Sequence, residues 1–250
     1  MNNIKLSVII PAYNEEDRIT TTLESLYNYF QNKDYLYEIL VVDDGSTDAT
    51  VKLVRTYAEK FTALRIIENG VNRGKGFSVH NGMQQATGEY RLFMDADNSV
   101  DIAHLETFMP WIEQGYDVVI GSIKINSAQV TERAGWHRRI LGNISKVLIR
   151  ILAVPGILDT QRGFKLFSAS AAEIIFPMQT IERFGFDIEL LVIAWVNGFK
   201  IKELPVVWNN PAGSKVTIAA YIQTFRELLY IVRNRITKKY TAQGILATDN

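Results

Sequence analysis

The sequence contains no cysteine among its 250 residues. This absence excludes disulfide bonds and metal sites built from thiolates, and it is compatible with a reducing compartment. A metal ion would have to be held by other ligands. Carboxylate oxygens favour magnesium, calcium or manganese over zinc or copper.

The sequence also lacks a long uncharged apolar run. Its most hydrophobic stretch, residues 140–158, is interrupted by Lys146 and Arg150, so it falls short of the roughly 18 uncharged residues expected of a membrane-spanning helix. The first residues lead directly into a strand pattern and an acidic turn, without the features of a cleaved signal peptide. We therefore expect a chain that is not exported through a cleaved leader and that contacts a bilayer, if at all, from its surface.

Neither sign of charge is in excess, because 27 basic residues balance 27 acidic ones. The distribution along the chain is uneven. Between residues 133 and 165 there are seven basic residues and one acid, Asp159. This local basic surface differs from the composition of a nucleic-acid-binding protein, and we expect no nucleic-acid partner.

With 47% hydrophobic residues the chain can bury a substantial core. The first half alternates short apolar runs with amphipathic segments, which predicts an α/β fold with a mostly parallel central sheet flanked by helices. The predicted strands are residues 6–10, 38–42, 64–67, 90–94 and 118–121. The predicted helices are residues 17–30, 49–61, 76–86 and 102–113.

After residue 122 we expect a long helix over about 134–153, a helix near 187–196, a strand over 201–207 and a final amphipathic helix with a basic end. The predicted organisation is one domain over residues 1–215, with a nucleotide-binding half (1–122) and an acceptor-facing half (123–215). An amphipathic C-terminal helix and tail follow over residues 216–250.

The most informative motif is the pair Asp95 and Asp97, which follows the predicted fourth strand. Alternate side chains of an extended chain point the same way, so these two carboxylates can converge on one hard divalent cation. Such a pair suits the binding of a metal-bound diphosphate. The alternative is a turn whose aspartates only cap the next helix.

Other polar motifs follow neighbouring strands, where α/β sheets bind ligands. We expect Pro11 to end the first strand, and the tyrosine face of Tyr13 with the carboxylate of Glu15 could hold a base and ribose. Asp43 and Asp44 follow the second strand, where acidic acceptors can bind a base N–H or ribose hydroxyls. Both motifs could instead only cap the helices that follow.

A glycine-flanked cation, Lys75 in NRGKG, precedes the third predicted helix. Free amide groups and a positive charge that point the same way form an anion-binding layout. The spacing matches neither the Walker loop nor the dinucleotide fingerprint.

Taken in order, PAYNEE, VVDDGSTD, NRGKG and DADN resemble the motifs of the inverting nucleotide-sugar glycosyltransferases of the GT-A fold, glycosyltransferase family 2, which have a single Rossmann-like domain. In the second half, GSIK, DTQRGFKLF, FGFDIELL and NNPAGSKV are similar to the branch of dolichyl-phosphate glucosyltransferases and polyprenyl-phosphate glycosyltransferases. The resemblance covers about residues 6–216.

The resemblance implies roles for residues in each motif. The nucleotide-sugar donor would be bound by Pro11, Tyr13, Glu15, Asp43, Asp44, Lys75, Asp95 and Lys215. A Mg or Mn ion would be held by Asp95 and Asp97, with Asp97 as a catalytic residue. The acceptor phosphate would be bound by Arg133, Arg138, Arg139 and Gln161. One departure is Ile123, where many relatives carry arginine; Lys124 could substitute for it.

The implied reaction is metal-dependent transfer of a hexose, glucose from UDP-glucose, to a polyprenyl or dolichyl phosphate by a protein bound peripherally to the cytoplasmic face of a membrane. A phosphate acceptor needs little help from a base, because its second pKa is about 6. GDP-mannose remains an alternative donor. A soluble enzyme that acts on a saccharide hydroxyl with Asp187 as catalytic base is a second alternative, although Asp187 could equally cap a helix. A non-catalytic nucleotide-binding protein is a third.

Overall fold

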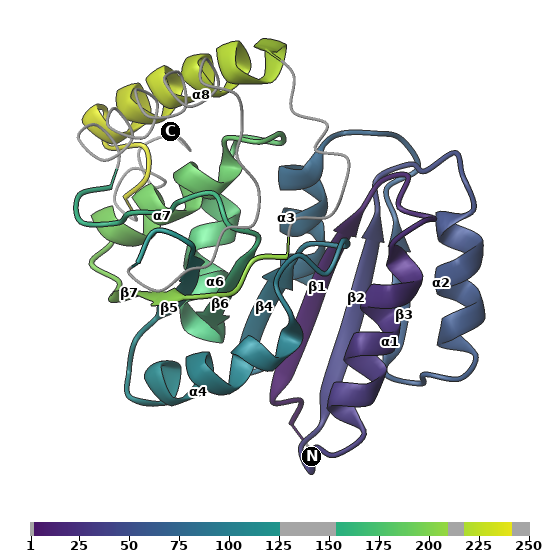
Figure 1. Cartoon of the computed structure of the whole chain (residues 1–250). Coiled ribbons are helices and arrows are strands. Elements are labelled where there is room, and N and C mark those ends of the chain that lie inside the picture. Colours follow the sequence, from purple (N-terminus) through teal and green to yellow (C-terminus); the bar gives the residue numbers. More distant parts are fainter. Residues whose placement is uncertain (1–2, 126–153, 210–217, 242–250) are drawn as a thin grey trace.

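A seven-stranded sheet forms the centre of the molecule (Figure 1). The computed structural model describes residues 3–125, 154–209 and 218–241. The strands lie in the order β3-β2-β1-β4-β6-β5-β7, and β6 is antiparallel to both of its neighbours while the other pairings are parallel. Their bounds are β1 Leu6–Ala12, β2 Tyr37–Asp43, β3 Leu64–Glu68, β4 Tyr90–Met94, β5 Val118–Ser122, β6 Phe164–Ser168 and β7 Ile201–Pro205.

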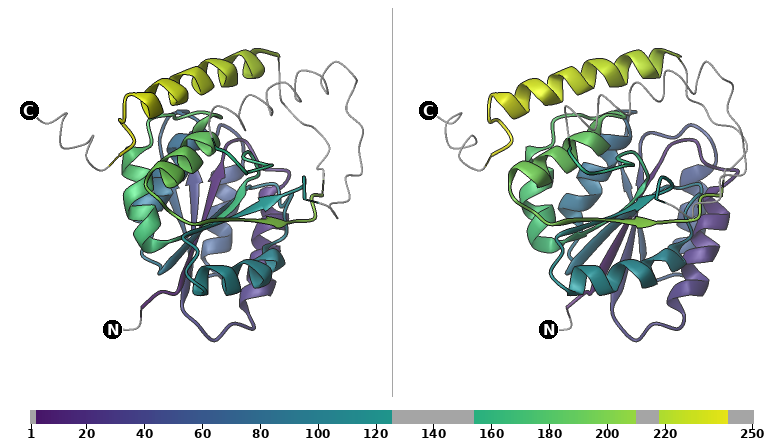
Figure 2. Two further views of the ribbon diagram at one scale, coloured as in Figure 1. Left: turned by 90° about the vertical axis from the view of Figure 1, so that its left-hand side faces the viewer. Right: turned by 60° about the vertical axis from the view of Figure 1, so that its left-hand side comes forward.

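Helices cover both faces of this sheet (Figure 2). The bounds are α1 Ile19–Phe30, α2 Thr50–Ala58, α3 Lys75–Gln85, α4 Leu105–Glu113, α6 Ala169–Ile175, α7 Phe186–Val196 and α8 Ile218–Ile236, with short 3-10 turns η1 Ile102–His104 and η2 Phe176–Met178. The helices α1, α2 and α4 pack on one face, and α3, α6 and α7 pack on the other. Helix α8 lies over α7, on the side away from the sheet (Figure 2).

The central strands are buried on both faces. In β1, Leu6, Val8 and Ile10 pack on the α1 and α4 side, whereas Ile9 packs on the α3 and α7 side. A strand that is covered on both faces needs a near-continuous apolar run. This explains why the strand patterns in the first half lack the alternation of half-exposed strands.

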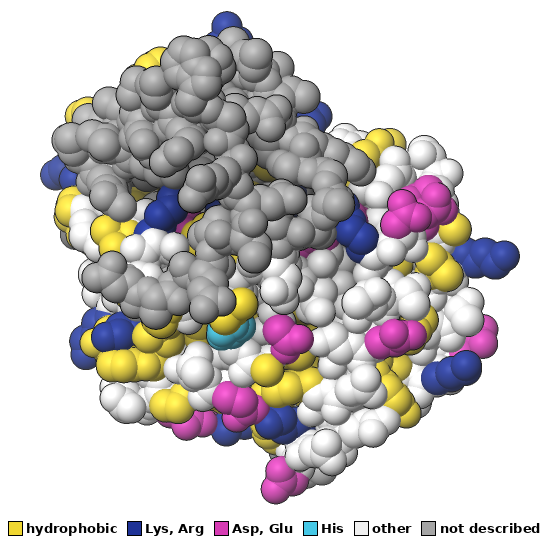
Figure 3. Space-filling view, in the orientation of Figure 1, with side chains coloured by type: hydrophobic (Ala, Val, Ile, Leu, Met, Phe, Trp, Pro, Cys, Tyr) yellow, Lys and Arg dark blue, Asp and Glu magenta, His cyan; other side chains and the backbone are white. Residues whose placement is uncertain are grey.

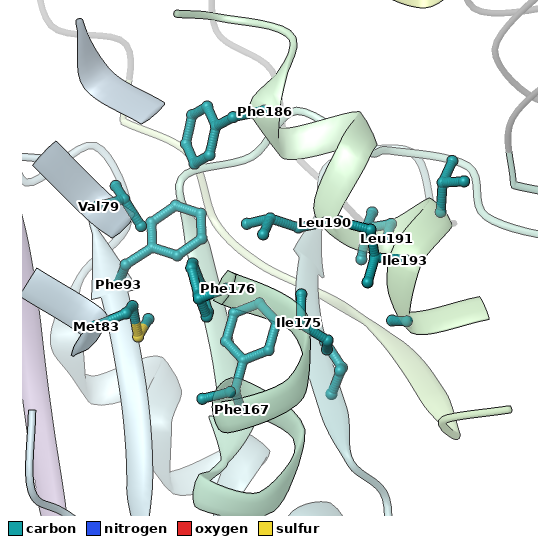
Figure 4. Close-up of a cluster of buried hydrophobic side chains, with 14 of the residues drawn as sticks. Val79, Met83, Phe93, Phe167, Ile175, Phe176, Phe186, Leu190, Leu191 and Ile193 are labelled. Carbon is teal, nitrogen blue, oxygen red and sulfur yellow. The ribbon is translucent and has the colours of Figure 1, made fainter. Parts of the chain in front are cut away.

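An aromatic cluster joins the sheet to the helix that carries Asp187 (Figure 4). The ring of Phe93 in β4 lies 5.7 Å from that of Phe186 in α7 and 6.4 Å from that of Phe167 in β6, measured between centroids. Phe93 lies two residues before Asp95, and Phe186 immediately precedes Asp187. The cluster therefore fixes the backbone positions from which both aspartates extend.

The predicted α/β class and the five strands of the first half are confirmed, with three differences. The expectation that Pro11 ends β1 is wrong: the strand continues through Ala12 and Pro11 pairs with Val42 of β2. Pairing with β4 stops at Ile9, so the missing N–H of Pro11 costs no ladder bond on that side. Strand β6 was not predicted, and the last predicted strand ends at Pro205. The helix predicted over 134–153 lies outside the described residues.

None of the described helices has the length and hydrophobicity needed to cross a bilayer. On the face in Figure 3, acidic and basic side chains are interspersed over the described part of the surface. This agrees with the overall charge balance.

Candidate functional site

The candidate site lies at the carboxyl ends of β1, β2 and β4. These strands are parallel neighbours, so the loops that follow them meet at one edge of the sheet. The loop after β1 is hydrogen-bonded to the loop after β2: Asn14 N donates to Ser46 Oγ at 3.0 Å, and Glu15 N donates to Thr50 Oγ1 at 2.8 Å. Tyr13, on the first of these loops, is 43% exposed and can contact a ligand.

Asp44 at the end of β2 organises the loop that leads into α3. Its carboxylate accepts from Asn69 Nδ2 at 3.1 Å, from Arg73 N at 3.0 Å and from Gly74 N at 2.7 Å. These three donors come from the protein itself. Asp44 therefore shapes the NRGKG loop, whatever else it contacts.

Only one of the two carboxylate oxygens of Asp43 accepts hydrogen bonds from the described residues. Its Oδ2 accepts from Gly45 N and Ser46 N, each at 3.0 Å. Its Oδ1 is buried and has no hydrogen-bond partner among the described residues. A buried oxygen without a partner is costly unless a ligand supplies the donor. Of the two adjacent aspartates, Asp43 is thus the one with an acceptor available for a ligand.

Asp95 is bonded to Lys75, the first residue of α3. Lys75 Nζ donates to Asp95 Oδ1 at 2.5 Å, and the two side chains are 25% and 28% exposed. On its other side Asp95 lies against Gly163, whose carbonyl accepts from Asp95 N at 3.1 Å. A Cβ at position 163 would lie 2.1 Å from Asp95 Oδ1, so only glycine fits beside this carboxylate.

Lys75 lies among three carboxylates. Burial opposes its positive charge, but Asp95, Asp187 and Asp97 outweigh this effect, and the pKa of Lys75 is raised. Lys75 is therefore an ammonium at neutral pH. The preceding residue, Gly74, has φ of 117° and leaves no room for a Cβ, which would lie 2.6 Å from Glu182 O. This close approach explains the glycine before Lys75.

Asp97 faces a second cation, Arg18. Asp97 Oδ1 accepts from Ser99 N at 3.0 Å, and Asp97 Oδ2 lies 4.0 Å from an Arg18 guanidinium nitrogen. The same guanidinium contacts Glu15 Oε2 at 2.5 Å. Arg18 therefore connects the loop after β1 to the loop after β4.

Asp187, in the first turn of α7, is paired with Lys165 of β6. Lys165 is fully buried, Asp187 is 5% exposed, and the Lys165 ammonium also donates to Arg162 O at 2.5 Å. Burial raises the pKa of Asp187 and lowers that of Lys165, while each partner favours the charged form of the other. Helix α7 has Gly185 as its N-cap, so Asp187 is not the capping residue.

The structure thus brings Lys75, Asp95, Asp97 and Asp187 to one site. Pro11 is buried within β1 and Gln161 is exposed in the loop before β6. The other residues that sequence reasoning assigned to the donor or acceptor lie outside the described residues: Arg133, Arg138, Arg139 and Lys215.

Sequence reasoning did not single out three residues that the structure places here. Lys165 could have been noticed as one charge inside the apolar run FKLF, because a charge in a strand covered on both faces needs a partner. Arg18 follows Glu15 at helical spacing, which favours an ion pair. The close contact that requires Gly163 has no signal in the sequence.

The donor set fits a magnesium or manganese ion that shares its coordination with a substrate. Asp97 is 23% exposed in its side chain, and Asp95 lies two residues before it. Among the described residues there is no group of three or more His, Cys, Asp or Glu side chains placed to hold an ion. Mg²⁺ is commonly held by one or two carboxylates together with water and substrate phosphates, which is the kind of site these residues could form.

Comparison with protein families gives a match over residues 7–176 to the family described as glycosyl transferase family 2. The chain is 37% identical over 245 residues to a dolichyl-phosphate beta-glucosyltransferase of Dictyostelium discoideum, covering 92% of this chain and 75% of the relative. It is 34% identical over 242 residues to the dolichyl-phosphate beta-glucosyltransferase of Homo sapiens, covering 91% and 74%.

Among solved structures, the fold is similar to glucosyl-3-phosphoglycerate synthase from Mycobacterium tuberculosis in complex with Mn²⁺, UDP and glucosyl-3-phosphoglycerate. The TM-score is 0.66 with 19% identity, covering 92% of this chain and 80% of that one. It is also similar to residues 1–349 of Staphylococcus aureus TarS in complex with UDP-GlcNAc, with a TM-score of 0.57 and 22% identity, covering 91% and 66%. At this identity the likeness shows a shared fold.

Proposed function

This chain belongs to glycosyltransferase family 2, and from that premise we propose that it transfers glucose from UDP-glucose to dolichyl phosphate or a related polyprenyl phosphate, with inversion at the anomeric carbon. Two relatives that match over more than nine-tenths of the chain are dolichyl-phosphate beta-glucosyltransferases. Their names support both the sugar and the acceptor.

The donor would bind at the ends of β1, β2 and β4. Asp43 Oδ1, which has no hydrogen-bond partner within the described parts of the chain, suits the N–H of a uracil ring, and the exposed ring of Tyr13 can lie against the nucleoside. Lys75, held between carboxylates at the start of α3, would contact the diphosphate through its ammonium group, while Asp44 holds the Arg73 and Gly74 amides of the same loop. The presence of UDP and of UDP-GlcNAc in two structures of similar fold supports a uridine nucleotide as part of the donor.

Asp97, with Asp95 beside it, would hold a Mg or Mn ion against the donor diphosphate. When bound, the ion offsets the negative charge that develops on the departing nucleoside diphosphate. The Mn²⁺ ion in the complex of glucosyl-3-phosphoglycerate synthase supports this choice. Asp97→Asn is expected to remove the stimulation of transfer by Mn²⁺.

The observation that carries the choice of acceptor is the ion pair between Lys165 and Asp187. A hydroxyl acceptor needs a base to take its proton. If Asp187 took that proton, the buried Lys165 ammonium would lose its partner, which is strongly unfavourable. A phosphate dianion needs no such base: one of its oxygens attacks the anomeric carbon, the bond from that carbon to the diphosphate oxygen breaks, and the electron pair leaves with the nucleoside diphosphate.

The acceptor phosphate would be held by Arg133, Arg138, Arg139 and Gln161, and Lys215 would complete the donor site. The lipid chain of such an acceptor lies in a membrane, so the protein would work at a membrane surface as a peripheral protein. The cytoplasmic leaflet carries a negative surface potential, which suits a protein with basic surface segments.

The experiment is a panel of UDP-glucose, other UDP-sugars and GDP-mannose, each incubated with a short polyprenyl phosphate and Mn²⁺ and analysed by mass spectrometry. We expect a lipid of glucose mass from UDP-glucose, and none when EDTA replaces Mn²⁺. A mannosylated lipid would overturn the donor assignment. A product on free saccharides without a lipid product would overturn the acceptor assignment, and nucleotide binding without any product would overturn the enzymatic one.

A further inference from the structure

One side of helix α8 packs against the rest of the protein. Leu228 and Ile231 are 2% and 0% exposed and belong to the core on the α7 side of the sheet. Glu227 Oε2 accepts from Gly185 N, the N-cap residue of α7, at 2.7 Å. This side of α8 is therefore buried by contacts within the protein.

The residues after α8 make further contacts with α7 and the residue that follows it. Tyr240 is 1% exposed, and its hydroxyl donates to Glu189 Oε1 of α7 at 2.7 Å. Asn197 Nδ2, just after α7, donates to Tyr240 O at 2.6 Å. The protein thus holds α8 against α7 at the middle of the helix and just beyond its C-terminal end, and the opposite side of α8 faces outward over the molecule (Figure 2).

The exposed surface of α8 carries large apolar residues at helical spacing along the edge next to its buried side. Phe225 is 47% exposed, Leu229 is 51% exposed and Ile236 is 74% exposed. They are four and seven residues apart, so they lie along one stripe of the helix. Tyr230, 41% exposed, lies about 100° round the helix from Leu229, beyond Arg226 and Arg233. We call Phe225, Leu229 and Ile236 the outer stripe of α8.

The charges around the outer stripe are all positive. Exposed cations flank it along the helix and just beyond: Arg226, Arg233, Lys238 and Lys239. A further cation, Arg235, lies 4.4 Å from the ring of Trp195, which is itself 41% exposed on α7. Within residues 218–241 the sequence has one acidic residue, Glu227, and that residue is turned inward to Gly185.

We propose that the outer stripe of α8 and its flanking cations bind the surface of a bilayer that contains anionic phospholipids, with α8 lying along the interface. This proposal rests on the proposed function in one respect, that a membrane presents the acceptor. An amphipathic helix with bulky apolar residues on one face and cations beside them binds such interfaces through apolar burial and attraction to headgroups.

The charge pattern favours a bilayer over a second copy of the chain. A two-fold contact through this stripe would place the same cations opposite each other, and the exposed side of α8 has no acidic residue with which to pair them. An anionic bilayer has an apolar interior that can bury the stripe and negative headgroups that can pair with the flanking cations. An exposed tryptophan and tyrosine also suit the headgroup level.

The test is flotation of the full chain with phosphatidylcholine vesicles, with and without phosphatidylserine. We expect binding only when phosphatidylserine is present. Leu229→Asp with Ile236→Asp should lower the bound fraction by about tenfold or more. The matched control is Leu36→Asp, because Leu36 is exposed to a similar extent (48%) in the loop before β2 and should bind like the parent.

A second variant tests the charges without altering the apolar residues. Arg226→Gln with Arg233→Gln should lose the preference for phosphatidylserine, and its binding should become less sensitive to salt. This variant keeps the proposal testable if the first one fails to fold. Unchanged binding of either variant would overturn the proposal, as would a parent chain that ignores vesicles and dimerises through residues sensitive to Leu229→Asp.

Activity separates this inference from the proposed function. The Leu229→Asp, Ile236→Asp variant should keep its turnover on a short, water-soluble polyprenyl phosphate and lose it on an acceptor embedded in vesicles. If the parent binds vesicles but glycosylates no acceptor, the proposed function fails and the bilayer surface stands. If the parent glycosylates the soluble acceptor but the variant works equally well on vesicles, the bilayer surface fails alone.

Discussion

The ammonium of Lys165 on β6 donates to the carboxylate of Asp187 on α7 inside the protein. Lys165 is fully buried and Asp187 is 5% exposed, so water contributes little to either charge. The pair connects the sheet to the helix beside Lys75 and Asp95. Because Asp187 already has this partner within the fold, we propose that it orders the site and does not take a proton from the acceptor.

The first prediction concerns the stability of this pair. Lys165→Met and Asp187→Asn each leave one buried group without its partner, and each should lower the free energy of unfolding by about 3–5 kcal/mol. The double variant leaves no unpaired charge and should be more stable than the sum of the single losses predicts. Urea unfolding of the four proteins measures this coupling, expected at about 2 kcal/mol or more. Strictly additive losses would show that the two groups do not interact.

A second prediction concerns Gly163. Because a Cβ there would lie 2.1 Å from Asp95 Oδ1, Gly163→Ala should displace the Asp95 carboxylate and lower kcat by about 100-fold, while the far-ultraviolet circular dichroism stays that of the parent. Gly121→Ala is the control, since its Cβ would lie 3.1 Å from the Val206 side chain, which can shift. Equal activities of the two variants would be inconsistent with a tight fit at Asp95.

A third prediction concerns the hydrogen bond between Tyr240, just after α8, and Glu189 of α7. Tyr240→Phe removes one donor to the buried Glu189 carboxylate, which still accepts from Thr180 and Ile181. The loss should be about 1–2 kcal/mol in the free energy of unfolding. Tyr27→Phe, at a tyrosine that is 40% exposed, should cost much less. A Tyr240→Phe protein as stable as the parent would contradict the role given to this hydroxyl.

A fourth prediction follows from Glu38 at the start of β2. Burial favours the neutral form, but Ser7 Oγ at 2.6 Å, the Thr87 amide and hydroxyl at 2.7 and 2.9 Å, and Arg65 outweigh it, and the pKa of Glu38 is lowered. A carboxyl with a lower pKa in the folded than in the unfolded state stabilises the fold above its unfolded pKa, and this contribution is lost as the pH falls through the folded value.

Unfolding by urea between about pH 7 and about pH 3 tests this sign. Glu38→Gln should be less stable than the parent at neutral pH, and the difference should shrink in acid. Glu59→Gln, at an exposed position, should follow the parent throughout. A difference between Glu38→Gln and the parent that does not change with pH would refute the assignment.

The sequence was sufficient for the parts of the fold that depend on local pattern. The continuous apolar runs before Pro11, Asp43 and Asp95 predicted parallel strands, and the polar residues after them predicted the edge at which a site forms. The order of these motifs then indicated the family. Such features can be predicted because the periodicity of apolar side chains and the residue types at strand ends both depend on neighbouring positions in the sequence.

Other features depend on where distant segments meet. The antiparallel direction of β6 depends on how the chain re-enters the sheet, which FKLFS does not encode. The pair between Lys165 and Asp187 joins residues 22 positions apart, and the pair between Lys75 and Asp95 joins residues 20 apart. Adjacent aspartates at 43 and 44 look equivalent in the sequence, and only the hydrogen bonds in the structure separate the one that shapes a loop from the one with an unpartnered oxygen.

The most direct test of the account is turnover by the double variant Lys165→Met, Asp187→Asn with UDP-glucose, Mn²⁺ and a short polyprenyl phosphate. This variant has neither a carboxylate base at position 187 nor an unpaired charge at position 165. If the acceptor is a phosphate dianion that needs no base, glucosyl transfer should fall by less than about 100-fold, which is the smallest contribution expected of a general base. Complete loss of transfer in a folded double variant that still binds UDP would contradict the account.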